Sequence, residues 1–593
     1  MKITRTFDLL SRYQKHFMKE DAFAFKQNKK WLKYSTRQYI DFSYQLSYGL
    51  MAMGFKSGDK IATVSSNRPE WNFVDMGMSM IGIVHVPLYT SLSSAEYEEI
   101  LKHSDARIVF ISDKQLVKKI KPVVEKIKNL EIIYTFDEIE NEKHWSEIIS
   151  LGKANTEKFK DELEKIKADI KPNDFASLIY TSGTTGASKG VMLSHKNLVR
   201  NFLAAADVFE MKPEQKYLSI LPLCHVGGRM GNYQTQYSGS SIYYAESMGT
   251  IANDMRDIKP HGFDAVPRIL EKIFDAIIAK GKKLKGIKKS LFFWAVKIGL
   301  KYKPPGESTC LYRLKLKIAD KLIFSKWREA IGGNIESVGC GGAFLPARIE
   351  RIFWAAGIKV LNMYGLTETS PIITINRKHK PNLRLGSVGP VIDGVEVKIA
   401  DDGEILCKGH NVMSGYYKNE SLTKQVFTDD GWFRTGDIGN IEDGKFLKVT
   451  DRKKEIFKLS SGKFIVPQAI ENKYKESLFI DNMMVIGEHE KFASAIIAPD
   501  YLYIKDWCLE NKISISDNSE LLKNDKLMNI FNKEVKMLNK SVSDFEKIKR
   551  FKLIPDEWSP ASGELSPTLK LKRKFIAAKY QSLIDEIYIK QTI

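Results

Sequence analysis

LIYTSGTTGASKG, residues Leu178–Gly190, joins an apolar run to a loop of glycine, serine and threonine. The apolar residues 175–180 predict a buried strand, and the loop that follows ends at Lys189 and Gly190. Glycine lets backbone N–H groups approach an anion closely, the hydroxyl groups add donors, and Lys189 adds a positive charge. We therefore expect this loop to bind the outer phosphates of ATP.

The loop differs from the P-loop of the common nucleotide hydrolases. A P-loop has glycine before its lysine and serine or threonine after it, whereas here Ser188 precedes Lys189 and Gly190 follows. Taken alone, this composition is also typical of a flexible surface loop. The choice between a phosphate site and a surface loop therefore depends on the other motifs of the chain.

Length, composition and charge narrow the class of protein. The chain has 593 residues, 43% hydrophobic and 28% charged, which is typical of a globular protein of roughly four units of ~150 residues. Its 92 basic and 72 acidic residues give a formal charge of +20, which favours nucleic acid, a membrane surface or phosphorylated small molecules as partners, or else a solvated lysine-rich surface. The absence of zinc-finger spacing or a helix-turn-helix signature argues against nucleic acid.

Cysteine usage and the N-terminus indicate the compartment. The five cysteines are far apart and form no C-x-x-C pair, which fits a reducing compartment: Cys224, Cys310, Cys340, Cys407 and Cys508. The N-terminal MKITRTFDLLSRYQKHFMKED lacks the apolar core of a signal peptide, and no apolar run approaches the ~20 residues of a membrane span. We expect a cytoplasmic protein, or one peripheral to the inner face of the membrane.

Strand and helix signals alternate along residues 1–170, which predicts a layered α/β sheet. After the loop, Gly190–Leu193 predicts a short strand, and Ser194 is placed to cap a helix over Asn197–Phe209. LSILPLCHVGGR then predicts a strand that ends in a turn with His225, a lone histidine of the kind that is usually structural.

Three further stretches place polar residues after strands or in turns. VLNMYGLTETSP, residues Val360–Pro371, offers Tyr364 to stack on adenine, Thr367 to bond a phosphate oxygen and Glu368 as a hard oxygen ligand for Mg²⁺, or is simply a solvated turn. GEILCKGHNVMSGYYKN, from residue 403, predicts hairpin strands and a tight turn. GWFRTGDIG puts Asp437 in a glycine-bounded turn, where the carboxylate could accept both ribose hydroxyls or cap the turn.

Residues 280–303 hold nine lysines and no acidic residue. Their spacing predicts a helix with one apolar stripe, formed by Leu284, Ile287, Leu291, Trp294, Ala295, Ile298 and Tyr302. This helix either packs on its own domain with a solvated lysine face or lies on an anionic membrane surface.

Together these motifs resemble those of the adenylate-forming (AMP-binding) superfamily, which includes acyl-CoA synthetases, luciferases and adenylation domains of peptide synthetases. The resemblance extends from Asp21 to Ile576. Within the superfamily, the chain is most similar to bacterial long-chain fatty acyl-CoA synthetases. The resemblance implies an α/β fold with a large N-terminal adenylation domain of layered sheets and helices, residues 1–450, and a small mobile C-terminal α/β domain, residues 451–593. The hinge is expected near 451–454, where the sequence pattern restarts.

The resemblance also assigns roles to residues. It implies that the nucleotide is bound by thirteen residues: Thr181, Ser182, Gly183, Thr184, Thr185, Gly186, Lys189, Gly342, Ala343, Tyr364, Gly365, Asp437 and Arg452. Catalysis falls to Lys570, Glu368 and Thr367, with Glu368 as the metal ligand, and the acyl pocket to His225, Gly227 and Gly341. Lys454 would be the hinge pivot, and Gly462 would admit the thiol arm.

The chain departs from the family pattern at three places. Val226-Gly227-Gly228-Arg229 replaces a bulky residue followed by Glu-Arg or Gly-Arg, which should widen the pocket mouth or loosen the turn. Cys340 stands where serine is usual, and Ser461 stands where long-chain relatives often have glycine.

The implied activity has two steps and uses ATP, Mg²⁺ and CoA. A long-chain fatty acid is activated to acyl-AMP with release of pyrophosphate, and the acyl group then passes to CoA. Three alternatives stay open at this point: a fatty acyl-AMP ligase that loads a carrier protein, a non-catalytic acyl-nucleotide sensor, and a luciferase-like oxygenase.

Overall fold

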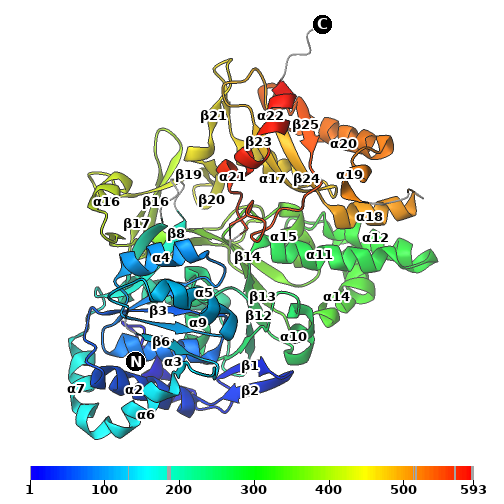
Figure 1. Ribbon diagram of the computed structural model, residues 1–593. Helices are drawn as coiled ribbons and strands as arrows, with labels where there is room; N and C mark the ends of the chain where they lie inside the picture. The colour runs from blue at the N-terminus through cyan, green and yellow to red at the C-terminus, as the bar shows by residue number, and fades with distance from the viewer. Residues whose placement is uncertain are drawn as a thin grey trace. The chain divides into compact units, whose positions relative to one another are not determined.

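The structure is a computed structural model that describes residues 2–130, 132–182, 188–511, 513, 517–566 and 569–588 (Figure 1). The chain divides into two compact units. The N-terminal unit comprises Met1–Gly342, Arg351–Val397 and Leu406–Arg434, and the C-terminal unit comprises Ala343–Glu350, Lys398–Ile405 and Thr435–Ile593. The expected fold, a large α/β domain followed by a smaller α/β domain, is confirmed, while the boundary at residue 451 stays a prediction.

One eight-stranded sheet of the N-terminal unit carries the phosphate loop. Its order is β18 (Gly415–Tyr416), β9 (Ser188–Ser194), β8 (Phe175–Ser182), β4 (Val84–Leu88), β3 (Lys60–Val64), β5 (Ile108–Ile111), β6 (Ile132–Thr135) and β7 (Lys143–His144). The strands from β8 to β7 pair in parallel, whereas β9 is antiparallel to both β8 and β18. The predicted strands of residues 1–170 and the strand after the loop are confirmed.

A second eight-stranded sheet lies in the same unit. Its order is β15 (Ile372–Ile375), β14 (Lys359–Gly365), β13 (Ser337–Cys340), β12 (Gly262–Ala265), β10 (Lys216–Ser219), β11 (Ser241–Tyr244), β1 (Phe23–Gln27) and β2 (Lys30–Tyr34). Only the outermost pairs, β14 with β15 and β1 with β2, are antiparallel among the described pairings.

Helices connect these strands in the alternation that a parallel sheet requires. They are α1 (Asp8–His16), α2 (Thr36–Ala52), α3 (Pro69–Met80), α4 (Ser94–Ser104), α5 (Lys114–Val124), α6 (Ser146–Ala154), α7 (Thr156–Asp169), α8 (His195–Phe209), α9 (Val226–Ser238), α10 (Ile251–Ile258), α11 (Pro267–Lys282), α12 (Gly286–Gly299), α13 (Cys310–Ala319), α14 (Ser325–Ala330) and α16 (Glu420–Val426). Helix α15 (Ala347–Ala355) has residues in both units. The predicted cap of α8 is confirmed, because the Ser194 hydroxyl accepts a hydrogen bond from the Asn197 N–H at 3.2 Å.

The C-terminal unit is built on a three-stranded sheet, β23 (Ile480–Ile486), β24 (Ser494–Pro499) and β25 (Arg550–Leu553). Its helices are α17 (Pro467–Tyr474), α18 (Tyr501–Glu510), α19 (Asn518–Leu521), α20 (Asp525–Leu538), α21 (Arg573–Lys579) and α22 (Gln581–Tyr588). A four-stranded sheet of β16 (Val395–Ile399), β17 (Glu404–Gly409), β19 (Phe433–Glu442) and β20 (Phe446–Arg452) has strands with residues in both units.

Three local predictions are wrong. Residues 280–303 form two helices, α11 and α12, because the chain turns between them and Gly286 takes a left-handed φ of +56°. The strands β17 and β18 do not form a hairpin, since β18 pairs with the edge of β9. Residues 226–229 are the first turn of helix α9 and not a loose turn, because His225 caps that helix by accepting a hydrogen bond from the Gly227 N–H at 3.1 Å.

The stripe predicted for residues 280–303 is only partly buried in the N-terminal unit. Ala295 and Ile298 are buried, and Ile287 is 86% exposed. The other four stripe residues are half-buried: Leu284, Leu291, Trp294 and Tyr302. The packed-helix alternative therefore describes α12 beyond its first turn. Among the described residues, every helix is too short or too polar to traverse a bilayer.

A buried arginine of α9 forms an ion pair with α3 and a hydrogen bond with β8, the strand that precedes the loop. Arg229, 2% exposed, donates from Nη2 to Asp75 Oδ1 at 2.5 Å and from Nη1 to Ser177 Oγ on β8 at 2.5 Å. Asp75 also contacts His85 at 2.7 Å and accepts from the Tyr233 hydroxyl. Burial alone would raise the pKa of Asp75, but the Arg229 charge and these hydrogen bonds hold it below its usual value.

Replacing Arg229 should destabilise the N-terminal unit strongly. Arg229→Met leaves the Asp75 carboxylate buried without its counter-charge, which costs about 3–5 kcal/mol of unfolding free energy. Urea denaturation measures the loss, and Arg313→Met, at an exposed arginine, is the matched control, expected within about 0.5 kcal/mol of the parent. Adding Asp75→Asn to Arg229→Met should recover part of the loss. Equal stability of Arg229→Met and the control would contradict the assignment.

Candidate active site

The phosphate loop is closed by a strand pair. In the antiparallel register of β8 and β9, Thr181 pairs with Lys189 and Ser182 with Ser188, so both ends of the loop are fixed by the sheet. Gly183, Thr184, Thr185 and Gly186 lie outside the described residues, as does the Ser182 side chain. The roles of these loop residues stay predictions, and the structure shows only that β8 and β9 pair on either side of the loop.

Tyr416 connects the lysine of this loop to the predicted metal ligand. The Lys189 Nζ lies 5.4 Å from the centroid of the Tyr416 ring, and the Tyr416 hydroxyl donates to Glu368 Oε1 at 2.8 Å. Tyr416 is buried, and burial together with the Glu368 charge raises the pKa of its hydroxyl, which keeps it a hydrogen-bond donor. The sequence motifs Ser-Lys-Gly and Thr-Glu-Thr therefore meet at one aromatic side chain.

The backbone around Tyr416 is held on both sides. Strand β18 pairs with β9 so that Tyr416 faces Val191, and the Tyr417 N–H donates to the Gly190 carbonyl at 2.8 Å. On the other side, the Met413 N–H donates to the Glu368 carbonyl at 2.8 Å. The short segment 413–417 thus bridges the end of the phosphate loop and the turn that carries Glu368.

That turn depends on a glycine. Strand β14 ends at Gly365, and Thr367 and Glu368 follow in a single 3-10 turn, η2 (Thr367–Thr369). A Cβ at Gly365 would lie 1.7 Å from the Pro371 carbonyl oxygen, so no larger residue fits without moving the backbone. The half-buried Tyr364 precedes it on β14, where it pairs with Thr374 of β15.

Glu368 fits the role of a Mg²⁺ ligand. Its Oε1 accepts from Tyr416, and within the described part of the chain its Oε2 accepts no hydrogen bond. The described residues contain no group of three or more His, Cys, Asp or Glu that could hold a metal ion by itself. Mg²⁺ in nucleotide enzymes is commonly held by one or two carboxylates plus the substrate phosphates, and a single half-buried carboxylate matches that pattern.

The predicted acyl-pocket residues lie on two elements of the N-terminal unit. His225 caps α9, and Gly227 lies in the first turn of that helix. Gly341 follows β13, where a Cβ would lie 2.7 Å from the Met363 Cγ on β14. Gly342 and Ala343 come next and are exposed, with Gly342 at a left-handed φ of +82°. That these residues share a pocket stays a prediction.

Asp437 and Arg452 lie side by side in the C-terminal unit. They pair across β19 and β20, and Arg452 Nε lies 3.3 Å from Asp437 Oδ1. The prediction that Asp437 sits in a turn is wrong: the chain bends at Gly436, where φ is +70°, and the strand continues through it. The sheet therefore presents a carboxylate and a guanidinium together, which suits a pair of ribose hydroxyls.

Lys570 lies on a loop anchored at both ends. The Lys570 N–H donates to Ser566 Oγ at 3.0 Å, and the Ser566 N–H donates back to the Lys570 carbonyl at 2.8 Å. Three residues further on, the Arg573 side chain pairs with Glu471 at 2.6 Å and with Glu455 at 2.7 Å. Because Glu455 lies just after the predicted hinge, this arginine connects the Lys570 loop to the hinge segment.

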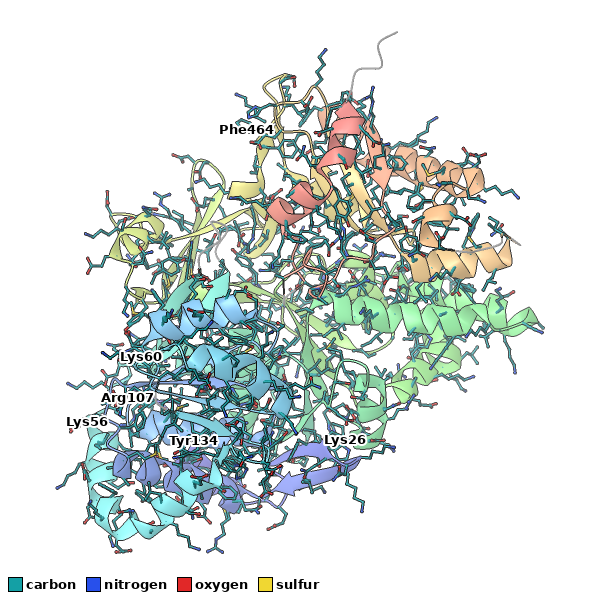
Figure 2. All side chains as sticks on the ribbon, in the orientation of Figure 1. Lys26, Lys56, Lys60, Arg107, Tyr134 and Phe464 are labelled. Atoms are coloured by element: carbon teal, nitrogen blue, oxygen red, sulfur yellow. The ribbon has the colours of Figure 1, made fainter. Side chains whose placement is uncertain are left out.

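The hinge and the thiol-arm glycine are also in the C-terminal unit. Lys454 lies in the 3-10 turn η3 (Lys453–Glu455), and its side chain is outside the described set. Gly462 lies in the turn between β21 (Phe457–Lys458) and β22 (Phe464–Ile465) at φ +83°. Among the described residues, a Cβ there would come within 4 Å of Lys458 Cε alone, at 3.8 Å. Phe464, 61% exposed, lies on the same hairpin (Figure 2).

Sequence reasoning missed Tyr416. It belongs to the Gly-Tyr-Tyr segment, for which the sequence predicts only a hairpin turn. The available signal is a pair of adjacent tyrosines after a glycine. In a strand, neighbouring side chains point to opposite faces of the sheet, so one of the two tyrosines would face the core. That signal predicts one buried tyrosine but not its partners.

Two family models match this chain. Residues 12–417 match the family described as AMP-binding enzyme, and residues 454–592 match the AMP-binding enzyme C-terminal domain. A long-chain-fatty-acid–CoA ligase (FadD15) of Mycobacterium bovis is 31% identical over 92% of this chain and 90% of its own length. Long chain acyl-CoA synthetase 3 of Arabidopsis thaliana is also 31% identical, over 92% of this chain and 85% of its own.

Solved structures share the fold at lower sequence identity. The anthranilate CoA ligase AuaEII in complex with anthranoyl-AMP matches with a TM-score of 0.73 and 17% identity, covering 98% of both chains. The adenylation domain of a carboxylate reductase from Mycobacterium chelonae matches with a TM-score of 0.75 and 20% identity, covering 98% of this chain and 91% of its own. On the strength of the family match, the full-length relatives and the shared fold, this chain belongs to the AMP-binding enzyme family.

Proposed function

We propose that the protein is a long-chain fatty acid–CoA ligase. It converts a fatty acid and ATP to acyl-AMP and pyrophosphate, and then transfers the acyl group to CoA with release of AMP. The observation that supports this proposal is that Lys189 and Glu368 both contact Tyr416, as expected if Lys189 binds phosphate and Glu368 binds the metal beside it. The relatives named as long-chain-fatty-acid–CoA ligases supply the substrate class.

In the first step, a carboxylate oxygen of the fatty acid attacks the α-phosphorus of ATP, and pyrophosphate leaves. Lys189 and the backbone N–H groups of its loop bind the outer phosphates, and Tyr416 holds the Glu368 carboxylate in one orientation. Glu368 would hold Mg²⁺, which when bound supplies positive charge to the phosphate oxygens. This step requires no nucleophile from the protein.

The C-terminal unit supplies the remaining charges. Asp437 and Arg452 hold the ribose, and Lys570 offsets the charge that builds up on the carboxylate and phosphate oxygens. For the second step the C-terminal domain turns about Lys454, and the hairpin with Gly462 admits the thiol arm of CoA. The thiolate attacks the acyl carbon, and AMP leaves.

Membrane association is a further part of this proposal. In the segment 280–303, Lys283, Lys285 and Lys288 are exposed and precede the buried part of α12. A cluster of lysines attracts anionic headgroups by about 1 kcal/mol each before salt screening. Such attraction would keep the enzyme near a bilayer, where long-chain fatty acids dissolve.

Pyrophosphate release across acids of increasing chain length, with and without CoA, tests the whole proposal. We expect release with long-chain acids and formation of a thioester only when CoA is present. Acyl-AMP that accumulates despite CoA would point to a carrier protein as acceptor. The absence of pyrophosphate release with every acid would exclude a ligase.

Glu368→Gln should keep the fold and lose adenylation by about 10²-fold or more, because the amide can still accept from Tyr416 but carries no charge for a metal. Single-turnover formation of acyl-AMP measures the loss. Tyr416→Phe is the matched control: it removes the hydrogen bond but leaves the charge, so the loss should be smaller. Activity of Glu368→Gln equal to the parent would remove Glu368 from the site.

Lys570→Ala and Gly462→Leu should separate the two half-reactions. We expect Lys570→Ala to slow acyl-AMP formation by about 10³-fold, yet to convert preformed acyl-AMP to thioester at nearly the parent rate. Gly462→Leu should slow only the thioester step. Because the φ of Gly462 also strains a leucine, Gly462→Asn, which tolerates a left-handed backbone, is the control for strain. Equal loss of both steps in Lys570→Ala would refute domain alternation.

The exposed lysines of segment 280–303 are tested by vesicle binding. Combining Lys283→Gln, Lys285→Gln and Lys288→Gln should weaken binding to anionic vesicles by about 100-fold at low salt, and by less at high salt. Lys533→Gln, Lys536→Gln and Lys540→Gln, at exposed lysines of α20 and after its end, are the charge-matched control. If the parent protein does not bind anionic vesicles at low salt, the membrane part of the proposal is refuted.

A further inference from the structure

Helix α13 and the π-helical turn η1 (Asp320–Phe324) carry an apolar stripe that faces solvent. Leu311 is 62% exposed, Leu314 57%, Ile318 44% and Leu322 40%. With about 3.6 residues per turn, positions separated by three and four residues fall on one side of a helix. Four large aliphatic side chains in a row are therefore left uncovered, which is uncommon on the surface of a soluble domain.

The opposite side of the same segment is firmly packed. Ala319, Ile323 and Phe324 are buried in the N-terminal unit. The Tyr312 hydroxyl donates to the Ile298 carbonyl on α12 at 2.9 Å, which ties α13 to the helix that follows the exposed lysines of segment 280–303. The stripe is thus a fixed feature of the surface, since its helix is anchored through its other face.

The rim of the stripe is basic. Arg313, Lys315, Lys317 and Lys321 are exposed and flank the four aliphatic residues. Within the described part of the chain, none of these four cations pairs with a carboxylate. Asp320, the single acidic residue between residues 310 and 328, is neutralised by Arg328 at 2.5 Å.

We propose that this stripe, Leu311, Leu314, Ile318 and Leu322, inserts into the surface of an anionic lipid bilayer. An interfacial helix buries its apolar face by about 5–10 Å while the flanking lysines and arginines reach the headgroups, and this segment has both elements. The lysines of segment 280–303 add long-range attraction, whereas the stripe supplies the apolar contact that attraction alone lacks.

The charges favour a bilayer over a second copy of the chain. A two-fold contact through this surface would bring the same four cations of each copy close together, and like charges at an interface are unfavourable. The choice of a lipid surface over an acidic protein rests on the proposed function, because a long-chain fatty acid is concentrated in a bilayer and an enzyme docked there meets its substrate.

Vesicle partitioning without ATP, CoA or fatty acid tests the insertion. The probes are vesicles of phosphatidylcholine with and without phosphatidylglycerol. Leu314→Ser combined with Ile318→Ser should lower partitioning to both vesicle types by at least about tenfold, because less apolar surface is buried. Leu502→Ser combined with Leu509→Ser, at leucines 66% and 72% exposed on α18, is the matched control and should bind as the parent does. Equal partitioning of the two double variants would overturn the proposal.

Hydrogen exchange locates the contact directly. Anionic vesicles should slow amide exchange in residues 310–324 of the parent protein. If the protein binds vesicles but exchange in this segment is unchanged, the proposal is overturned. Sedimentation velocity tests the alternative that a second copy of the chain covers the stripe. A dimer that forms without lipid and dissociates in the Leu314→Ser, Ile318→Ser variant would assign the stripe to a second copy and overturn the bilayer proposal.

The outcomes separate this inference from the proposed function. Glu368→Gln should partition to vesicles as the parent does, because Glu368 is remote in sequence and role from the stripe. If the chain partitions through the stripe but releases no pyrophosphate with any acid, the insertion stands and the ligase proposal falls. If it ligates a fatty acid supplied in soluble form and the stripe variants partition unchanged, the ligase proposal stands and the insertion falls.

Discussion

Strand β9 is hydrogen-bonded along both of its edges, and the candidate site depends on that double pairing. On one edge β8 fixes the two ends of the phosphate loop, and on the other β18 delivers Tyr416 to the strand that bears Lys189. Backbone pairing is what makes this precise, because a shift of register by one residue would turn Tyr416 to the opposite face of the sheet. Lys189 and Glu368 both contact the Tyr416 side chain, and the pairing of β18 with β9 fixes the position of Tyr416.

The strands and caps near the phosphate loop follow from local sequence. The apolar run before the loop, the strand after it and the Ser194 cap are each specified by neighbouring residues, so they could be predicted. The turn that carries Thr367 and Glu368 could also be predicted, because Gly365 and the strand before it lie within one short motif. The family resemblance supplied the order of these motifs along the chain.

What could not be predicted arises from pairings distant in sequence. That β18 joins β9 and leaves β17 in another sheet is decided by which edges are free, which a local pattern does not encode. Asp437 has turn residues on both sides, yet pairing with β20 extends the strand through it. The sequence predicts an apolar stripe in residues 280–303, which tertiary packing partly buries, whereas the more exposed stripe lies one helix further on, in α13.

The pairing of Tyr416 with Val191 joins residues 225 positions apart (416 minus 191). Closing such a separation is entropically costly, and contacts of this kind form late in folding. During synthesis, the ribosome must translate more than two-thirds of the chain before β18 exists to cover the edge of β9. Until then that edge is open to pairing with other strands, so the nascent N-terminal unit is expected to need protection from aggregation for longer than its own core requires.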